Sequence, residues 1–187
     1  EQIHLRTFCL RECEAYVKAA GLALNRNQIL QYYMIFGGVP YYWGFLKKGL
    51  SLSQNIDSIL FEKDAPLRDE FKYLYASVFK KPENYVKIIE ALGTKKVGMT
   101  REEIITATKI PNSGDLTTKL EELESCGFIR KYNAFGMKKK NAIYQLMDCF
   151  TLFYFKFLKS EPTDEHFWTN QINTPAVNTW LGLAFER

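Results

Sequence analysis

The sequence predicts a mainly α-helical protein with one β-hairpin. Apolar residues recur at helical spacing through most of the chain, capping residues and glycines mark helix ends, and only residues 129–147 contain paired β-prone runs. Of the 187 residues, 47% are hydrophobic, 15% are aromatic and 25% are charged. This composition excludes a disordered or fibrous protein and allows a sizeable core without disulfides or metal.

Residues 1–80 are predicted to form a bundle of short helices, each with a start or stop signal. Gly21 ends the helix predicted at residues 10–20. The predicted starts are Asn25 with Gln28 for residues 27–36, Pro40 for residues 41–46, and Ser51 with Gln54 for the helix that contains Ile56. A longer helix is expected to begin at Asp64 and Pro66, and its apolar face would consist of Phe71, Leu74, Tyr75, Val78 and Phe79. Pro82 interrupts it and marks the predicted domain boundary.

Residues 81–147 follow the order helix, helix, turn, helix, hairpin. The first helix is expected at residues 85–92. The second begins at the capping pair Thr100 and Glu103, and the third covers residues 116–123. Two β-prone runs, residues 129–135 and 142–147, flank a turn at residues 136–141. This order is the plan of a winged helix-turn-helix, which we expect as the second domain.

Residues 148–187 are predicted to hold an aromatic connector helix and the beginning of a third domain. Thr174 and Pro175 start a helix whose apolar face stops at Arg187 without a capping residue, and the chain opens at Glu1 without an initiator methionine. We therefore expect a fragment of a longer protein. The longest apolar run, residues 149–155, is too short to span a bilayer and nothing indicates a signal peptide, so we expect a cytoplasmic protein without a membrane partner.

Neither a metal site nor a catalytic centre is expected. The cysteines at positions 9, 13, 126 and 149 lack the paired spacing of a zinc site, and the chain has two histidines, so we expect ordinary buried thiols. Residues 93–100 imitate a phosphate-binding loop, but Met99 replaces the required lysine and a helix precedes the segment. We interpret it as a turn between helices.

The charge pattern bears on DNA binding. The net charge is +4, but residues 113–126 carry one lysine against four acidic residues, a surface that phosphates repel. The candidate DNA-binding residues lie instead in the hairpin, and they are Arg130, Lys131, Lys138, Lys139 and Lys140. Contacts there would be weakly sequence-specific. Docking of a protein and a purely architectural role remain alternatives, and a solvated hairpin tip would explain the same lysines.

Aromatic residues concentrate in residues 32–45, where they favour a core over a stacking platform for bases because they recur at helical spacing. Within this segment, residues 37–42 resemble the helical lid of prokaryotic AAA/STAND-type ATPases, whose lid carries a Gly-x-Pro motif. Other stretches of the chain are similar to that family in order and spacing. Phe8-Cys9-Leu10 is similar to the end of the strand before the lid, and Glu14-Ala15-Tyr16 is similar to a stretch of the lid. Residues 100–104 and 127–129 are similar to parts of the family's winged helix. Residues 180–186 are similar to the first helix of a PD-(D/E)XK nuclease-like domain.

The resemblance implies a helical lid at residues 1–80, a winged helix at 81–147, and a connector with a truncated nuclease-like domain at 148–187. An upstream P-loop domain of the same chain would bind ATP with Mg²⁺. Gly38, Val39 and Pro40 would lie near the adenine of that nucleotide. The lid would then pass the nucleotide state to a winged helix that docks protein or DNA. The alternative is a free-standing winged-helix DNA-binding regulator.

Overall fold

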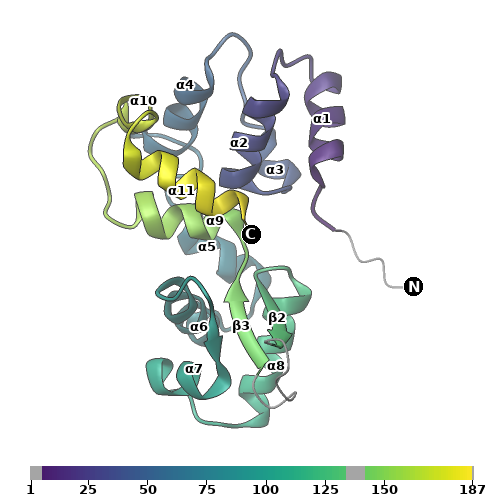
Figure 1. Ribbon diagram of the computed structural model, residues 1–187, viewed down its shortest axis with the longest axis vertical. Helices are drawn as coiled ribbons and strands as arrows, with labels where there is room; N and C mark the ends of the chain where they lie inside the picture. The colour runs from purple at the N-terminus through teal and green to yellow at the C-terminus, as the bar shows by residue number, and fades with distance from the viewer. Residues whose placement is uncertain (1–5, 134–141, 187) are drawn as a thin grey trace. The chain divides into compact units, whose positions relative to one another are not determined.

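A computed structural model describes residues 6–133 and 142–186 of the chain. The described residues form mainly helices and a small three-stranded antiparallel sheet, which confirms the mainly α prediction (Figure 1). The chain divides into two compact units. Unit 1 comprises Glu1–Phe71 and Cys149–Arg187, and unit 2 comprises Lys72–Asp148. The beginning and the end of the chain therefore build one unit.

Unit 1 is a helical assembly around an aromatic core. Its elements are α1 (Leu10–Ala19), α2 (Arg26–Phe36), α3 (Pro40–Trp43), α4 (Leu52–Ile56), the π-helix η1 (Asp57–Phe61), α9 (Cys149–Phe153), the π-helix η3 (Tyr154–Leu158), α10 (Phe167–Gln171) and α11 (Pro175–Phe185). Helix α2 packs against α1, α9 and α11. Fully buried rings include Tyr32, Phe36, Trp43, Phe153 and Trp168, and burying one such ring contributes roughly 1.5–3 kcal/mol.

The predicted helix starts of unit 1 are largely confirmed because their capping contacts form locally. Asn25 and Gln28 make a reciprocal capping box, with Oδ1 of Asn25 accepting from the Gln28 N–H at 2.9 Å. Ser51 and Gln54 do the same before α4, and Pro40 is the first residue of α3. Such caps satisfy N–H groups that have no partner inside the helix.

The helix predicted from Asp64 is wrong over its first residues. Helix α5 (Glu70–Val78) begins later, after π-helix η1 and a series of turns. The guanidinium of Arg68 donates to the carbonyl oxygens of Phe61 at 2.6 Å and of Pro162 at 3.3 Å. The Pro162 contact joins segments 94 residues apart. Together the two contacts support the turns at residues 62–69, so tertiary structure overrides the local helix signal.

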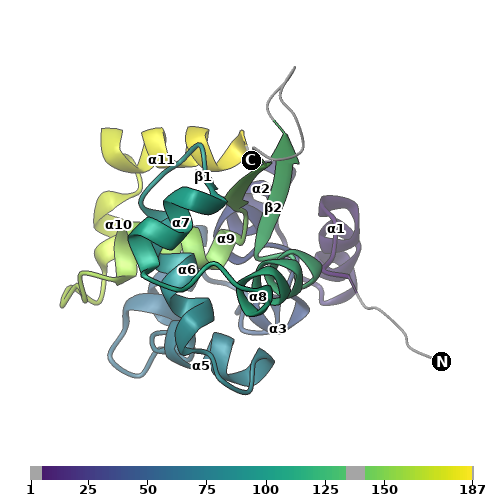
Figure 2. The ribbon, with the colours of Figure 1, turned by 90° about the horizontal axis from the view of Figure 1, so that it is seen from below.

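Unit 2 combines most of α5 and three further helices with the sheet. After α5 come α6 (Glu83–Gly93), β1 (Met99–Thr100), α7 (Arg101–Thr108), α8 (Gly114–Ser125), β2 (Ile129–Asn133) and β3 (Ala142–Leu146). The strand order is β1-β3-β2, with Met99 opposite Tyr144 and Ile129 opposite Leu146. Strands β1 and β2 are labelled in Figure 2. The predicted hairpin β2–β3 is confirmed. Strand β1 was not predicted, because two residues are too few to show the alternation of apolar and polar side chains. The turn predicted at residues 136–141 lies outside the described residues.

The core of unit 2 forms where aromatic side chains of α5 and α6 meet the segment after α8. The ring of Tyr75 lies 4.9 Å from that of Phe128, and Phe79 stacks on Tyr85 at 3.8 Å between ring centroids. Val78, predicted on the buried face of this helix, is 46% exposed. A residue at the end of a helix lies at the edge of the packed face, which leaves Val78 beside solvent.

Candidate functional site

The Gly37–Pro40 corner between α2 and α3 is held by backbone contacts. The N–H of Phe8 donates to the carbonyl oxygen of Gly38 at 2.7 Å, and the indole N–H of Trp43 donates to that of Gly37 at 2.8 Å. A Cβ on Gly38 would lie 1.8 Å from the carbonyl oxygen of Phe8. Only glycine fits there, because any side chain would collide with the backbone of Phe8.

The corner turns apolar surface toward solvent. Val39 is the N-cap of α3 and half-buried, Pro40 is exposed, and Tyr41 is 60% exposed with its ring 5.0 Å from that of Phe45 in an edge contact. Among the three predicted nucleotide-binding residues, Val39 and Pro40 therefore offer side-chain surface, whereas Gly38 is buried against Phe8. Tyr41 was predicted as core and is the exposed member of its cluster.

The stretch Phe8-Cys9-Leu10 is not the end of a strand among the described residues. Residues 6–9 are in neither helix nor strand, and Leu10 begins α1. Cys9 lies at the N-cap of α1, where its backbone N–H donates to Oε2 of Glu12 at 2.7 Å. The capping contact explains why a helix starts where the sequence suggested a strand end.

The described candidate DNA-binding residues are Arg130 and Lys131, both exposed on β2. Arg130 donates from Nε to Oε1 of Gln145 at 2.8 Å, while Nζ of Lys131 lies 5.7 Å from the ring centroid of Tyr144. Consecutive strand residues point to opposite faces, so these two cations do not form one patch. Lys138, Lys139 and Lys140 lie outside the described residues.

Helix α8 displays the acidic surface that the sequence predicted. Asp115, Glu121 and Glu124 are exposed on it. Asp115 pairs with Nζ of Lys119, and Oε1 of Glu124 accepts from the backbone N–H of Lys131 at 3.2 Å. These contacts leave the negative charge near solvent, where it repels phosphates.

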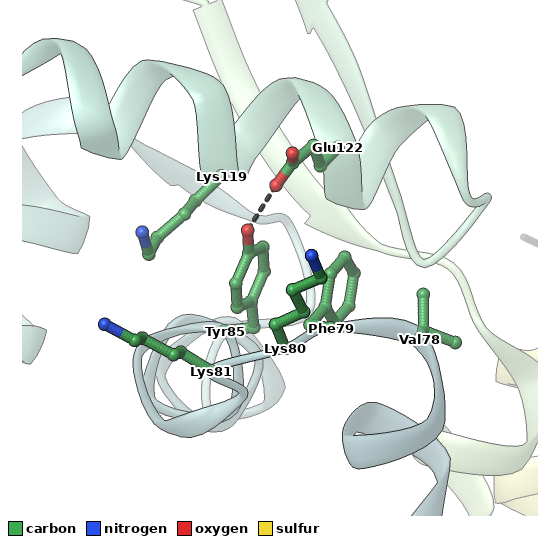
Figure 3. A pocket seen from close by; sticks show the side chains of 7 residues that line it. All are labelled: Val78, Phe79, Lys80, Lys81, Tyr85, Lys119 and Glu122. Carbon is green, nitrogen blue, oxygen red and sulfur yellow. Dashed lines mark hydrogen bonds between the residues drawn. The ribbon is translucent and has the colours of Figure 1, made fainter.

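A groove beside α8 is a concave feature that the sequence did not reveal. It has a volume of about 490 Å³ and lies between the segment joining α5 to α6 and one side of α8 (Figure 3). The stacked rings of Phe79 and Tyr85 form its floor, and the hydroxyl of Tyr85 donates to the carboxylate of Glu122. Burial, followed by that bond, raises the pKa of Tyr85 to about 12, so the phenol stays protonated at neutral pH.

Three lysines line the same groove. Lys80 and Lys81 come from the segment after α5, and Lys119 comes from α8 with Nζ 5.3 Å from the Tyr85 ring centroid. Lys81 and Lys119 extend on the same side of the Tyr85 ring from opposite walls (Figure 3). The sequence signal was the adjacent pair of lysines before Pro82, which spacing alone did not connect to Lys119.

The four cysteines differ in exposure, and Cys149 is half-buried. Cys13 is buried, and burial raises the pKa of its thiol to about 12, which makes it an unreactive core residue. Cys9 and Cys126 are exposed, so the expectation of buried thiols is wrong for both. Within residues 6–133 and 142–186, no group of three or more His, Cys, Asp or Glu side chains could hold a metal ion.

The segment that imitates a phosphate-binding loop is a turn between helices, as interpreted from the sequence. Helix α6 precedes it, and Met99 enters the sheet. Gly98 adopts φ +84, and a Cβ there would lie 2.5 Å from the carbonyl oxygen of Tyr144. This glycine therefore serves the close approach to β3.

No protein-family model, curated protein or solved structure matches this chain. In the part of the chain that the structure describes, no helix combines the length and apolarity needed to cross a membrane.

Proposed function

We propose that this chain is part of a AAA/STAND-type ATP-binding ATPase. Its first region would act as a lid that contacts adenine, and unit 2 would be the winged helix that docks protein or DNA in response. A P-loop domain of the same chain would hold ATP and Mg²⁺. The assignment of residues 148–187 to a connector and a nuclease-like domain remains a prediction, and in the structure α9, α10 and α11 belong to unit 1.

The observation that carries the proposal is the apolar surface at the corner. Pro40 and Tyr41 are exposed next to each other, and the backbone beneath them is held by the contact between Phe8 and Gly38. A rigid apolar surface suits a purine ring, because little conformational entropy is lost when the ring packs on it. Residues 38–41 contain no charged side chain, so they fit a base and would leave phosphates and Mg²⁺ to other residues.

The element order of unit 2 supports the winged-helix part of the proposal. A helix, a short strand, two helices and a hairpin follow one another, and β1 joins the hairpin in a three-stranded sheet. In a winged helix of this order α8 would be the recognition helix, and its exposed acidic residues favour a protein partner over a DNA major groove.

The test uses the complete gene product. Mass spectrometry should detect a mass far above 21.8 kDa and a G-x-x-x-x-G-K-[ST] peptide upstream of Glu1. Pro40→Ala should then weaken ATP binding about tenfold by removing one apolar contact. Pro175→Ala is the matched control, because Pro175 is also exposed and also the first residue of a helix. Unchanged nucleotide affinity and turnover in Pro40→Ala would contradict the adenine contact.

The second candidate function is a free-standing winged-helix DNA-binding regulator. The exposed cations Arg130 and Lys131 on β2 favour it. Such a regulator would bind duplex DNA with a salt slope of about −0.9 per phosphate contact, and neutralising Lys138, Lys139 and Lys140 would reduce that slope. A native mass near 21.8 kDa without a P-loop peptide would favour this candidate over the ATPase.

A further inference from the structure

The lysine-lined groove of unit 2 presents uncompensated positive charge. Lys80 and Lys81 are exposed and make no hydrogen bond or ion pair with the described residues. Lys119 is partly neutralised by Asp115, and the carboxylate of Glu122 accepts from the Tyr85 hydroxyl. The groove therefore attracts an anionic group, and at least two ammonium groups are available to bind it.

The groove also has an apolar part. Its floor is the stacked pair Phe79 and Tyr85, and Val78 at its rim is 46% exposed. A surface that combines cations with an apolar rim is complementary to a segment that carries carboxylates and one apolar side chain. A volume of about 490 Å³ accommodates a few side chains of such a segment.

We propose that this groove binds a short acidic segment of a partner protein. Asp115, Glu121 and Glu124 are exposed on α8, the helix that supplies Lys119. A duplex carries phosphates along its whole length and would meet these carboxylates, whereas a peptide can place its few carboxylates beside the lysines alone. The inference rests on the docking part of the proposed function and names its partner, but it does not depend on the adenine contact.

The experiment measures binding of two fluorescent probes to the 187-residue chain by anisotropy. One probe is a short peptide of Glu and Asp with a central Phe, and the other is a short DNA duplex. The peptide with Gln and Asn in place of the acidic residues reports the contribution of charge. Titrated with the labelled acidic peptide, ¹⁵N-labelled protein should show amide shift changes around Lys81, Tyr85 and Lys119.

The variant Lys80→Gln/Lys81→Gln/Lys119→Gln should bind the acidic peptide about tenfold more weakly. The matched control is Lys47→Gln/Lys63→Gln/Lys87→Gln, which removes the same charge from exposed lysines outside the groove and should change affinity less than about twofold. Circular dichroism checks that each variant is folded. If the groove variant does not fold, Lys81→Gln alone provides the comparison, because Lys81 is exposed and makes no hydrogen bond or ion pair with the described residues.

Saturable peptide binding that the groove variant weakens and the control preserves would support the proposal. Equal losses in both variants would overturn it, because binding would then follow total charge. The absence of saturable peptide binding, or tighter binding of DNA that is lost in the groove variant, would also overturn it, and the latter would identify a nucleic-acid partner. Pro40→Ala should leave peptide affinity unchanged, so the outcome is separable from that of the lid assignment.

Discussion

The two units differ in how far along the chain a capping side chain lies from the helix that it caps. In unit 2, Thr100 and Glu103 cap α7 from three positions apart, and Ser113 caps α8 through the N–H of Leu116. In unit 1, the first turn of α10 is held by the buried carboxylate of Asp57. This carboxylate accepts from the N–H of Trp168, 111 residues later, at 2.7 Å. Both π-helices among the described residues also lie in unit 1.

This difference shows which structural features depend on tertiary contacts. A cap formed within one turn is available to the chain before it folds, whereas the Asp57 contact exists only after distant segments meet. Breaking a buried contact between distant segments should therefore cost more stability than changing a local or exposed group. Three sets of variants test this expectation, and their effects on stability should decrease in the order given below.

Gly38→Ala should have the largest effect. The added Cβ would lie 1.8 Å from the carbonyl oxygen of Phe8, so the two backbone segments must separate. We expect a loss of about 3 kcal/mol in the free energy of unfolding, measured by urea denaturation. Gly182→Ala is the control, since nothing lies within 4 Å of that Cβ in α11 and alanine favours a helix by roughly 0.5–1 kcal/mol. Equal stability of Gly38→Ala and wild type would contradict the close backbone approach.

Asp57→Asn should have the next largest effect. Asp57 is 2% exposed and accepts from the backbone N–H groups of Trp168 and Thr169 and from the Thr169 hydroxyl at 2.5 Å. An amide places an NH₂ group against these donors, and we expect a loss of about 2–3 kcal/mol in urea denaturation. Asp164→Asn alters an exposed carboxylate near the same helix and should have a much smaller effect. Similar losses in the two variants would indicate that the buried contact has no special weight.

The pH dependence of two carboxylates should differ in sign and have the smallest effect. Burial raises the pKa of Glu70 in unit 1, whereas hydrogen bonds from Lys95 and from the Thr100 N–H lower the pKa of Glu103 in unit 2. The contribution of Glu70 is therefore largest at low pH and is lost as the pH rises through its folded pKa. That of Glu103 is present above the unfolded pKa and is lost as the pH falls through its folded pKa.

Urea denaturation of Glu70→Gln and Glu103→Gln between about pH 3 and pH 7 measures this difference. Relative to wild type, Glu70→Gln should become more stable as the pH rises, and Glu103→Gln should become less stable. The Glu103 effect is small because solvent screens this exposed side chain. If the stability difference between variant and wild type changed with pH in the same direction for both variants, the opposite pKa shifts of Glu70 and Glu103 would be contradicted.

The candidate sites were partly predictable from the sequence. Gly38 and Pro40 stand out because a glycine pair before a proline marks a helix corner, and the structure places them in one. The exposure of Tyr41 was not predictable, because periodicity identifies a face without saying what covers it. Lys119 joins Lys80 and Lys81 only through the packing of α8 beside the segment after α5.

Most helix starts and the hairpin are predictable from local sequence, because capping boxes, proline positions and strand alternation act over a few residues. The turns at residues 62–69, the pairing of β1, the start of α10 and the lysine groove depend on tertiary contacts. Each of these depends on groups far apart in the chain. Their contact energy appears only after the entropy cost of bringing them together has been met.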